Sequence, residues 1–360
     1  MLLPRVLVIS CGGTISSVHT SATGRRGVAP TLDAATLVAQ LPELAAVARI
    51  EAAGFSTLPS SHATLAWVLL LRQEIVRRLD EAERDPSGEG PFAGVVITHG
   101  TDTLEEVAFG LDLLWDRDLP VVVTGAMRNA SLPGADGPAN LLAAVATAGH
   151  QPAWGLGVLV VLNDQIHLAG YVRKMHTSSV ATFCSPSVGP LGYLAEGTPR
   201  IIFTPTTRLP LATPPTQVGD VAVALLTLGI GDDGRLLPSI AACGYRGLVI
   251  EGFGGGHVTR EIAESSRLDD LVAVMPVILA SRTGSGATLH GTYDYAGSEV
   301  DLLPRGLIPA GDLDGLKARV LLTFLLAAGA SRGEIVQAFA VHGRLMPAHP
   351  THPAGTSPVQ

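Results

Sequence analysis

Short runs rich in valine, leucine and isoleucine alternate with longer helical patterns along the first half of the chain. The apolar runs predict buried strands at residues 6–10, 94–98, 120–124 and 157–161. The longer patterns predict helices at residues 34–47, 64–83, 104–114 and 138–146. Strands that are apolar throughout and separated by helices are typical of a parallel sheet covered on both faces. We therefore expect polar chemistry at the carboxyl ends of these strands.

A proline-rich stretch without a regular period, residues 204–215, interrupts this pattern. It predicts a linker at residues 206–219 between an N-terminal domain, 1–205, and a C-terminal domain, 220–342. A second alternating series predicts the remaining elements: strands at 221–227, 247–251 and 274–280, and helices at 259–271 and 313–328. The fold class is therefore α/β, with a large N-terminal parallel-sheet domain and a smaller C-terminal α/β domain. Residues 343–360, rich in proline and histidine, are expected to form a flexible tail.

The composition excludes several classes of protein. Of the 360 residues, 47% are hydrophobic and 16% charged, which excludes a disordered chain. A net charge of −8 argues against binding to nucleic acid or an anionic membrane surface. No stretch approaches about 18 uninterrupted apolar residues, so no transmembrane helix is expected.

The cysteines and histidines do not form the patterns of a disulfide framework or a metal site. Cys11, Cys184 and Cys243 are odd in number and widely spaced. The histidines of the C-terminal tail also lack zinc-site spacing. The strand-like run that begins at Arg5 has no secretory signal before it. We therefore expect a cytoplasmic protein without a metal.

Three widespread catalytic signatures are absent: the phosphate-binding P-loop, the H-E-x-x-H zinc motif and the G-x-S-x-G serine elbow. Residues 252–257 approach a dinucleotide-binding G-x-G-x-x-G motif, but the sixth position is His257. This segment is expected to be a tight turn between a strand and a helix.

Hydroxyl and carboxylate side chains follow the predicted strands. Thr14 comes after two glycines at the end of the first strand, and Thr101 and Asp102 follow the strand at 94–98. Taken alone, Thr14 is typical of a turn. Thr101 or Asp102 is typical of a helix N-cap, and Glu105 would complete a capping box with it. Their shared position at strand ends favours a cleft that presents hydroxyl groups.

Lysine is rare in this chain. Of its 24 basic residues, only Lys174 and Lys317 are lysines. Arginine does not lose its proton in proteins, whereas lysine does when its surroundings lower its pKa. Each lysine therefore raises the question of whether its site needs a chemistry that arginine lacks.

Taken in order, four segments resemble the motifs of the bacterial-type L-asparaginase/glutaminase family, from Val6 to about Ala340. They are Cys11-Gly-Gly-Thr-Ile15, His99-Gly-Thr-Asp-Thr103, Thr124-Gly-Ala-Met-Arg128 with Ala135-Asp-Gly-Pro-Ala-Asn140, and Arg173-Lys-Met-His-Thr177. Two further stretches, at 180–183 and 189–193, are also similar. The resemblance implies a flavodoxin-like N-terminal domain, a smaller C-terminal domain and no cofactor.

The resemblance also implies roles for individual residues. Thr14 would be the nucleophile that attacks the side-chain amide, and Thr101, Asp102 and Lys174 would form a second triad. Lys174 would act either as a neutral base through Thr101 or as a fixed charge. Asp102 would orient the lysine and meet the substrate α-amino group. The implied substrate-binding residues are Ser60, Ser61, Gly100, Ala126, His257 and Tyr293, with Ser60 at the α-carboxylate.

The chain departs from the family at positions that affect substrate recognition. No tyrosine precedes Tyr171, and Gly27 falls where the family has a tyrosine on its mobile loop, here residues 16–30. Ser61 stands where the family has a glutamine. His257 and Tyr293 stand where a neighbouring subunit supplies an asparagine and an acidic residue. These changes leave the preference for asparagine or glutamine open.

The resemblance implies a homodimer or homotetramer that takes L-asparagine, with sites at subunit interfaces and no nucleic-acid or membrane partner. Three alternatives remain: a glutaminase-leaning amidohydrolase, the amidase subunit of a tRNA-dependent amidotransferase, and a non-hydrolytic amino-acid sensor. The amidotransferase subunit usually carries an extra N-terminal domain, whereas here the first strand is predicted within a few residues of Met1. The complete set of Thr14, Thr101, Asp102 and Lys174 argues against a sensor, which needs no nucleophile or base.

Overall fold

The chain divides into two compact units, Met1–Asp220 and Val221–Gln360. The structure, a computed structural model, describes residues 2–19, 28–30, 32–85, 89–204, 208–214 and 216–344. The stretch that the sequence predicts to be a linker contributes to the first unit. Arg208 donates hydrogen bonds to Asp112, and the 3-10 helix η6 (Thr216–Asp220) packs against α2 (Leu65–Arg84). Of the predicted tail, residues 345–360 lie outside the described residues.

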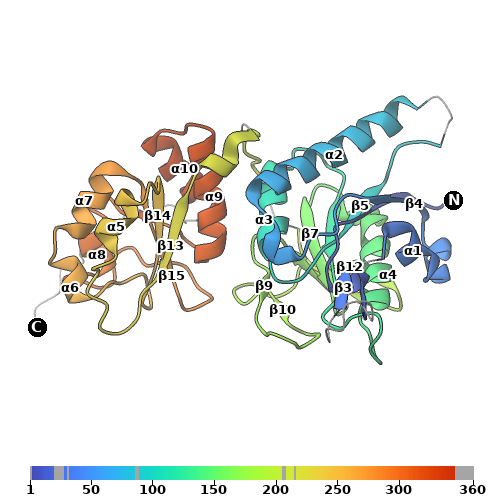
Figure 1. Cartoon of the computed structure of the whole chain (residues 1–360), viewed down its shortest axis with the longest axis horizontal. Coiled ribbons are helices and arrows are strands. Elements are labelled where there is room, and N and C mark those ends of the chain that lie inside the picture. Colours follow the sequence, from blue (N-terminus) through green and yellow to red (C-terminus); the bar gives the residue numbers. More distant parts are fainter. Residues whose placement is uncertain are drawn as a thin grey trace, which may run out of the picture. The chain divides into compact units, whose positions relative to one another are not determined.

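The first unit is built on an eight-stranded sheet with the order β12-β11-β8-β7-β6-β5-β1-β4 (Figure 1). In that order the strands are β12 (Thr198–Ile201), β11 (Gly192–Ala195), β8 (Gln165–Leu168), β7 (Val158–Leu162), β6 (Val121–Thr124), β5 (Gly94–Thr98), β1 (Arg5–Ser10) and β4 (Arg49–Gly54). The five strands from β7 to β4 are parallel, which confirms the predicted sheet.

The remaining three strands run antiparallel, which the sequence reading did not predict. Asn163 and Asp164 join β7 to β8, and both have positive φ angles, 50° and 58°. Two successive left-handed residues form the hairpin turn whose twist suits antiparallel strands, and asparagine and aspartate tolerate this conformation. The chain therefore turns back directly after β7 instead of crossing over through another helix.

Alternate residues of each parallel strand enter two separate cores. In β1, Leu7 and Ile9 pack on one face and Val6 and Val8 on the other. Figure 1 shows α2 and α3 (Leu104–Leu114) on one side of the sheet and α1 (Ala34–Ala39) and α4 (Gly137–Ala148) on the other. Burial on both faces explains why these strands are apolar throughout.

Two predicted helices are shorter than expected. The pattern at 34–47 yields α1 followed by the separate 3-10 helix η3 (Pro42–Ala46), because Pro42 has no N–H for a continuing helix. The pattern at 259–271 yields α6 (Arg260–Ala263) and α7 (Arg267–Val274). Between them the Ser265 hydroxyl donates to the Ile262 carbonyl. Such side-chain hydrogen bonds compete with the backbone hydrogen bonds of a helix and favour its end.

The second unit contains a four-stranded parallel sheet, β13 (Val223–Thr227), β14 (Gly247–Gly252), β15 (Val277–Ser281) and β16 (Ile308–Pro309). Its other helices are α5 (Leu237–Ala242), α8 (Glu299–Leu302), α9 (Gly315–Ala327) and α10 (Arg332–His342). The predicted strand at 274–280 was placed too early, because Val274 is the last residue of α7.

Short strands and turns complete the elements: β2 (Ser17–His19), β3 (Val28–Pro30), β9 (Arg173–Lys174), β10 (Phe183–Cys184), and the 3-10 helices η1 (Thr14–Ser16), η4 (Ser60–His62) and η5 (Gln151–Ala153). After β14, Phe253 and His257 exchange backbone hydrogen bonds across a tight turn. This confirms the interpretation of residues 252–257 as a turn.

Lys317 is fully buried in an ion pair with Asp314 at the start of α9, which indicates a structural role.

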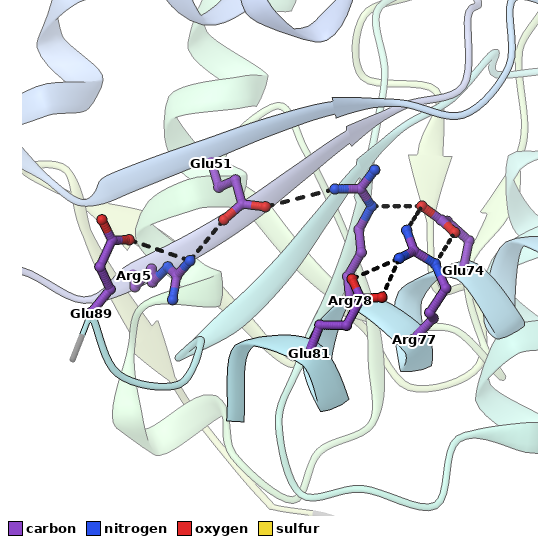
Figure 2. A network of polar contacts seen from close by, with 7 residues as sticks. All are labelled: Arg5, Glu51, Glu74, Arg77, Arg78, Glu81 and Glu89. Carbon is purple, nitrogen blue, oxygen red and sulfur yellow. Dashed lines mark hydrogen bonds and ion pairs between the residues drawn. The ribbon is translucent and has the colours of Figure 1, made fainter. Parts of the chain in front are cut away.

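A charged network joins the amino end of β1 to β4 and the second half of α2 (Figure 2). Arg5 donates to Glu51 at 2.8 Å and to the Gly90 carbonyl at 2.7 Å, and its guanidinium stacks 4.4 Å above the Phe92 ring. Arg78 links Glu51 to Glu74. The network ties α2 to the edge strand β4, at the end of the sheet remote from the predicted site.

Arg5→Ala is expected to lower the free energy of unfolding by about 1–2 kcal/mol, since it removes a stacked, charge-assisted contact that is only 10% exposed. The contact is remote from the predicted site, so activity per folded molecule should not change. Arg77→Ala is the matched control, because its side chain pairs with Glu74 and Glu81 on an exposed helix face and should contribute less. Urea denaturation of both variants checks this, and equal losses would contradict it.

Candidate active site

The loops after β1 and β5 meet at the carboxyl edge of the sheet. The two strands are parallel neighbours, with Ser10 opposite Thr98. Beyond them Gly13 has a φ of +88°, and a Cβ placed there would lie 2.4 Å from the backbone N and Cα of Gly100. Only glycine permits so close an approach of two backbones. The two motifs that the sequence reading linked are therefore in direct contact.

Thr14 begins the 3-10 helix η1 directly after this contact. The hydroxyl groups of Ser16 and Ser17 donate to the Gly13 carbonyl at 3.0 and 2.8 Å and hold the turn. Ile15 and Ser16 are buried, whereas Thr14 is partly exposed. Thr14 is thus the least buried residue of this helix.

Thr101, Asp102 and Lys174 come together as a polar triad. The Lys174 ammonium nitrogen lies 2.9 Å from Thr101 Oγ1 and 2.7 Å from Asp102 Oδ1. Thr101 is buried, the Lys174 side chain is 15% exposed and the Asp102 side chain is 68% exposed. Lys174 therefore has one buried hydroxyl partner, Thr101, and one carboxylate partner that faces solvent, Asp102. Lys174 is on β9, far along the chain from the motif that it meets.

Glu105 is a member of this cluster that the sequence reading assigned to another role. Its buried carboxylate accepts a hydrogen bond from the Lys174 backbone N–H at 2.6 Å. The interpretation as part of a capping box is wrong, because Thr103 is the N-cap of α3 and no side chain caps the helix. An acidic residue within an apolar helix face was the signal that could have indicated this burial.

Ser60 connects the triad to a third segment. Its hydroxyl accepts from the Asp102 backbone N–H at 3.3 Å, and its carbonyl accepts from the Thr103 hydroxyl at 2.8 Å. A Cβ on Gly100 would lie 2.7 Å from Ser60 Oγ. Ser60 and Gly100 are thus beside the triad, and Ser61 follows in an exposed position.

The motif after β6 is held by Asp136 and Asn140. The Asp136 carboxylate accepts from the backbone N–H groups of Met127 and Arg128, and the Asn140 amide donates to the Gly125 carbonyl. These motif residues therefore shape the loop. Ala126 has no exposed surface, so a direct contact with substrate would require a neighbouring group to move.

A pocket of about 500 Å³ opens beside the triad, lined by Asp102, Lys174, Met175, His176 and Thr177. Its wall comes from the segment after Lys174, which the sequence reading noted only for its lysine. His176 Nδ1 accepts hydrogen bonds from two backbone N–H groups, at Ser178 and Ser179, each at 3.0 Å. This ring shapes the loop on which the pocket depends.

The remaining predicted residues lie elsewhere. His257 and Tyr293 belong to the second unit, where their ring centroids are 5.2 Å apart. Residues 20–27 of the predicted mobile loop, including Gly27, lie outside the described residues.

Burial raises the pKa of the Cys11 thiol well above its usual range, so this cysteine is an inert packing group beside the Thr14 motif.

Within the described ranges, no group of three or more histidine, cysteine, aspartate or glutamate side chains is placed to hold a metal ion. The same part of the chain contains no helix long and apolar enough to cross a membrane.

Comparison with known proteins yields matches along nearly all of the chain. Residues 5–207 match the family described as Asparaginase, N-terminal, and residues 222–339 match the Glutaminase/Asparaginase C-terminal domain. A probable L-asparaginase of Deinococcus radiodurans is 37% identical over 356 residues, covering 94% of this chain and 97% of that protein. An L-asparaginase of Bacillus licheniformis is 33% identical over 323 residues, covering 90% and 95%.

Among solved structures, a probable cytoplasmic L-asparaginase from Campylobacter jejuni is similar, with a TM-score of 0.80 and 30% identity. The match covers 93% of this chain and 99% of that one. Both family domains, the relatives and the fold agree, and the chain therefore belongs to the asparaginase family.

Proposed function

We propose that this protein hydrolyses L-asparagine to L-aspartate and ammonia, with Thr14 as the nucleophile. The observation that carries the proposal is the triad of Thr101, Asp102 and Lys174 at the strand edge where Gly13, the residue before Thr14, lies against Gly100. Relatives matched along nearly the whole chain are named L-asparaginases, which supports the same substrate.

In the proposed reaction, the Thr14 hydroxyl attacks the side-chain amide carbon, and its proton leaves through a base. Thr101 and Lys174 are proposed to take that proton: Lys174 Nζ lies 2.9 Å from Thr101 Oγ1, and a neutral lysine would accept the proton through that hydroxyl. The proton then passes to the departing amine, which leaves as ammonia from an acyl-enzyme ester. Water attacks this ester, restores the Thr14 hydroxyl and releases aspartate.

Substrate recognition is proposed to use the polar groups around the triad. The exposed Asp102 carboxylate would bind the α-ammonium group, and the Ser60 hydroxyl would bind the α-carboxylate. Ser61, Gly100 and Ala126 belong to the same proposed site. His257 and Tyr293 would complete the site of a neighbouring subunit, in a homodimer or homotetramer.

Ammonia release from asparagine and from glutamine, measured without added metal or cofactor, tests this function. Faster release from asparagine supports the proposal, and faster release from glutamine indicates the glutaminase alternative. Binding of either amide without ammonia release would overturn hydrolysis in favour of a sensor. We propose that the enzyme is cytoplasmic, which its similarity to a probable cytoplasmic L-asparaginase from Campylobacter jejuni supports.

The loop at residues 16–30 leads to a prediction about affinity. It contains no tyrosine, phenylalanine or tryptophan to clamp a small substrate. Ordering such a loop costs about 1–2 kcal/mol of backbone entropy per residue, and this cost reduces net binding. The ends of this loop pair as the strands β2 and β3. We expect a KM for asparagine of about 1 mM or more, and hydrogen-exchange protection of the residues between these strands only with bound aspartate.

Gly27→Tyr should lower this KM, and Gly24→Tyr, three residues away in the same loop, serves as its control. A low-micromolar KM together with a loop already protected in the free enzyme would contradict the prediction.

A further inference from the structure

In the second unit, three rings surround a buried carboxylate. His257 lies edge-on to Tyr293 and Tyr295, with ring centroids 5.2 and 5.5 Å away, and the two tyrosine rings are 6.1 Å apart. Both tyrosines are about half exposed, while Glu299 beneath them is fully buried. An exposed aromatic face above a buried acid is an arrangement that attracts a cation.

Glu299 holds the cluster from below. One carboxylate oxygen, Oε1, accepts from the backbone N–H groups of Thr292 and Tyr293 at 2.6 and 2.8 Å. The other, Oε2, lies 2.9 Å from His257 Nε2. Burial by itself raises the pKa of Glu299, but the bonds from Tyr293, its own backbone N–H, Thr292 and His257 outweigh it and lower the pKa. An ionised carboxylate only accepts, so the hydrogen must be on His257 Nε2.

The other ring nitrogen meets Tyr295. His257 Nδ1 lies 2.8 Å from the Tyr295 hydroxyl. Partial burial, followed by the nearby Glu299 and Tyr293, raises the pKa of Tyr295, so this side chain keeps its hydrogen at neutral pH. In a neutral His257 that carries its hydrogen on Nε2, Nδ1 accepts the Tyr295 hydrogen. The lone pairs of the Tyr295 oxygen are then left for a group outside the cluster.

We infer that Glu299 is a positioning residue that acts through His257, and that Tyr295 is a further recognition residue whose hydroxyl accepts from the α-ammonium group of the substrate. This inference rests on the proposed function, in which His257 and Tyr293 complete the site of a neighbouring subunit. The relay from Glu299 through His257 to Tyr295 makes the tyrosine an acceptor, and an ammonium group has only donors.

Glu299→Gln tests the relay because its geometry leaves one arrangement. The glutamine oxygen must stay where two backbone N–H groups point, so the NH₂ group faces His257 Nε2. The ring must then carry its hydrogen on Nδ1 and donate to Tyr295, whose own hydrogen turns outward. Nitrogen-15 NMR of histidine-labelled protein should show His257 with its hydrogen on Nε2 in the wild type and on Nδ1 in the variant. His257→Asn assigns the signal.

Kinetics test the role in recognition. Glu299→Gln and Tyr295→Phe should each raise the KM for asparagine about tenfold and leave kcat within about threefold. The double variant should be no worse than the more affected single variant, because both act on one acceptor. Glu264→Gln, an exposed acid paired with Arg260, is the control and should leave KM unchanged.

An unchanged His257 tautomer in Glu299→Gln, a wild-type KM in Tyr295→Phe, or additive effects in the double variant would overturn the inference. If Glu299→Gln fails to fold, Tyr295→Phe on the exposed ring still decides the recognition role. A wild type that releases no ammonia from either amide overturns the proposed function and the role of Tyr295 in it. The tautomer measurement separates that outcome from a failure of the relay.

Discussion

Thr14→Ala is expected to lower kcat for asparagine at least about a hundredfold while the protein stays folded. Nucleophile and general-base contributions are of the order of 10²- to 10⁴-fold, and the variant keeps the surrounding site but has no attacking oxygen. The turn itself should survive, because the hydroxyl groups of Ser16 and Ser17 hold the Gly13 carbonyl. Ammonia release and thermal unfolding together check this prediction.

Thr14→Ser is the matched control for this experiment. It keeps a hydroxyl at the same position and should retain far more activity than the alanine variant. Near-normal turnover in a folded Thr14→Ala protein would remove Thr14 as the nucleophile and shift attention to the buried Thr101.

Lys174→Arg is expected to be nearly as damaging to turnover as Lys174→Met, again with losses of about a hundredfold or more. Arginine keeps the positive charge but cannot give up its proton at neutral pH. Comparing kcat of the two variants separates proton transfer from charge.

Lys317→Arg controls for a general effect of replacing lysine. This lysine forms a buried ion pair with Asp314, so its loss should reduce stability without changing turnover per folded molecule. If Lys174→Arg retained most of the activity, Lys174 would be an electrostatic anchor and the base would have to be another group.

Local patterns predicted the parallel part of the sheet well. The strands β1, β5, β6 and β7 lie within one residue of the predicted ranges, and α3 covers the predicted 104–114. Continuous apolar runs predict these strands correctly because both faces of each strand are buried. The hairpin between β7 and β8 was missed, because its signal is only the pair Asn163 and Asp164.

The sequence by itself determined which chemical groups stand at the strand ends. Thr14 after two glycines and Thr101 with Asp102 are set by neighbours along the chain, since a strand, a turn and a helix follow from local composition. Fold class and family followed from the same local information.

Only the tertiary structure decided which of these groups meet. Lys174 and Glu105 are 69 positions apart, and His257 and Glu299 are 42 apart. A buried carboxylate must find hydrogen-bond donors, but the donors it finds depend on how strands and loops pack, which no local periodicity encodes. The local pattern therefore assigns Glu105 to a capping box, and it gives no signal for Glu299.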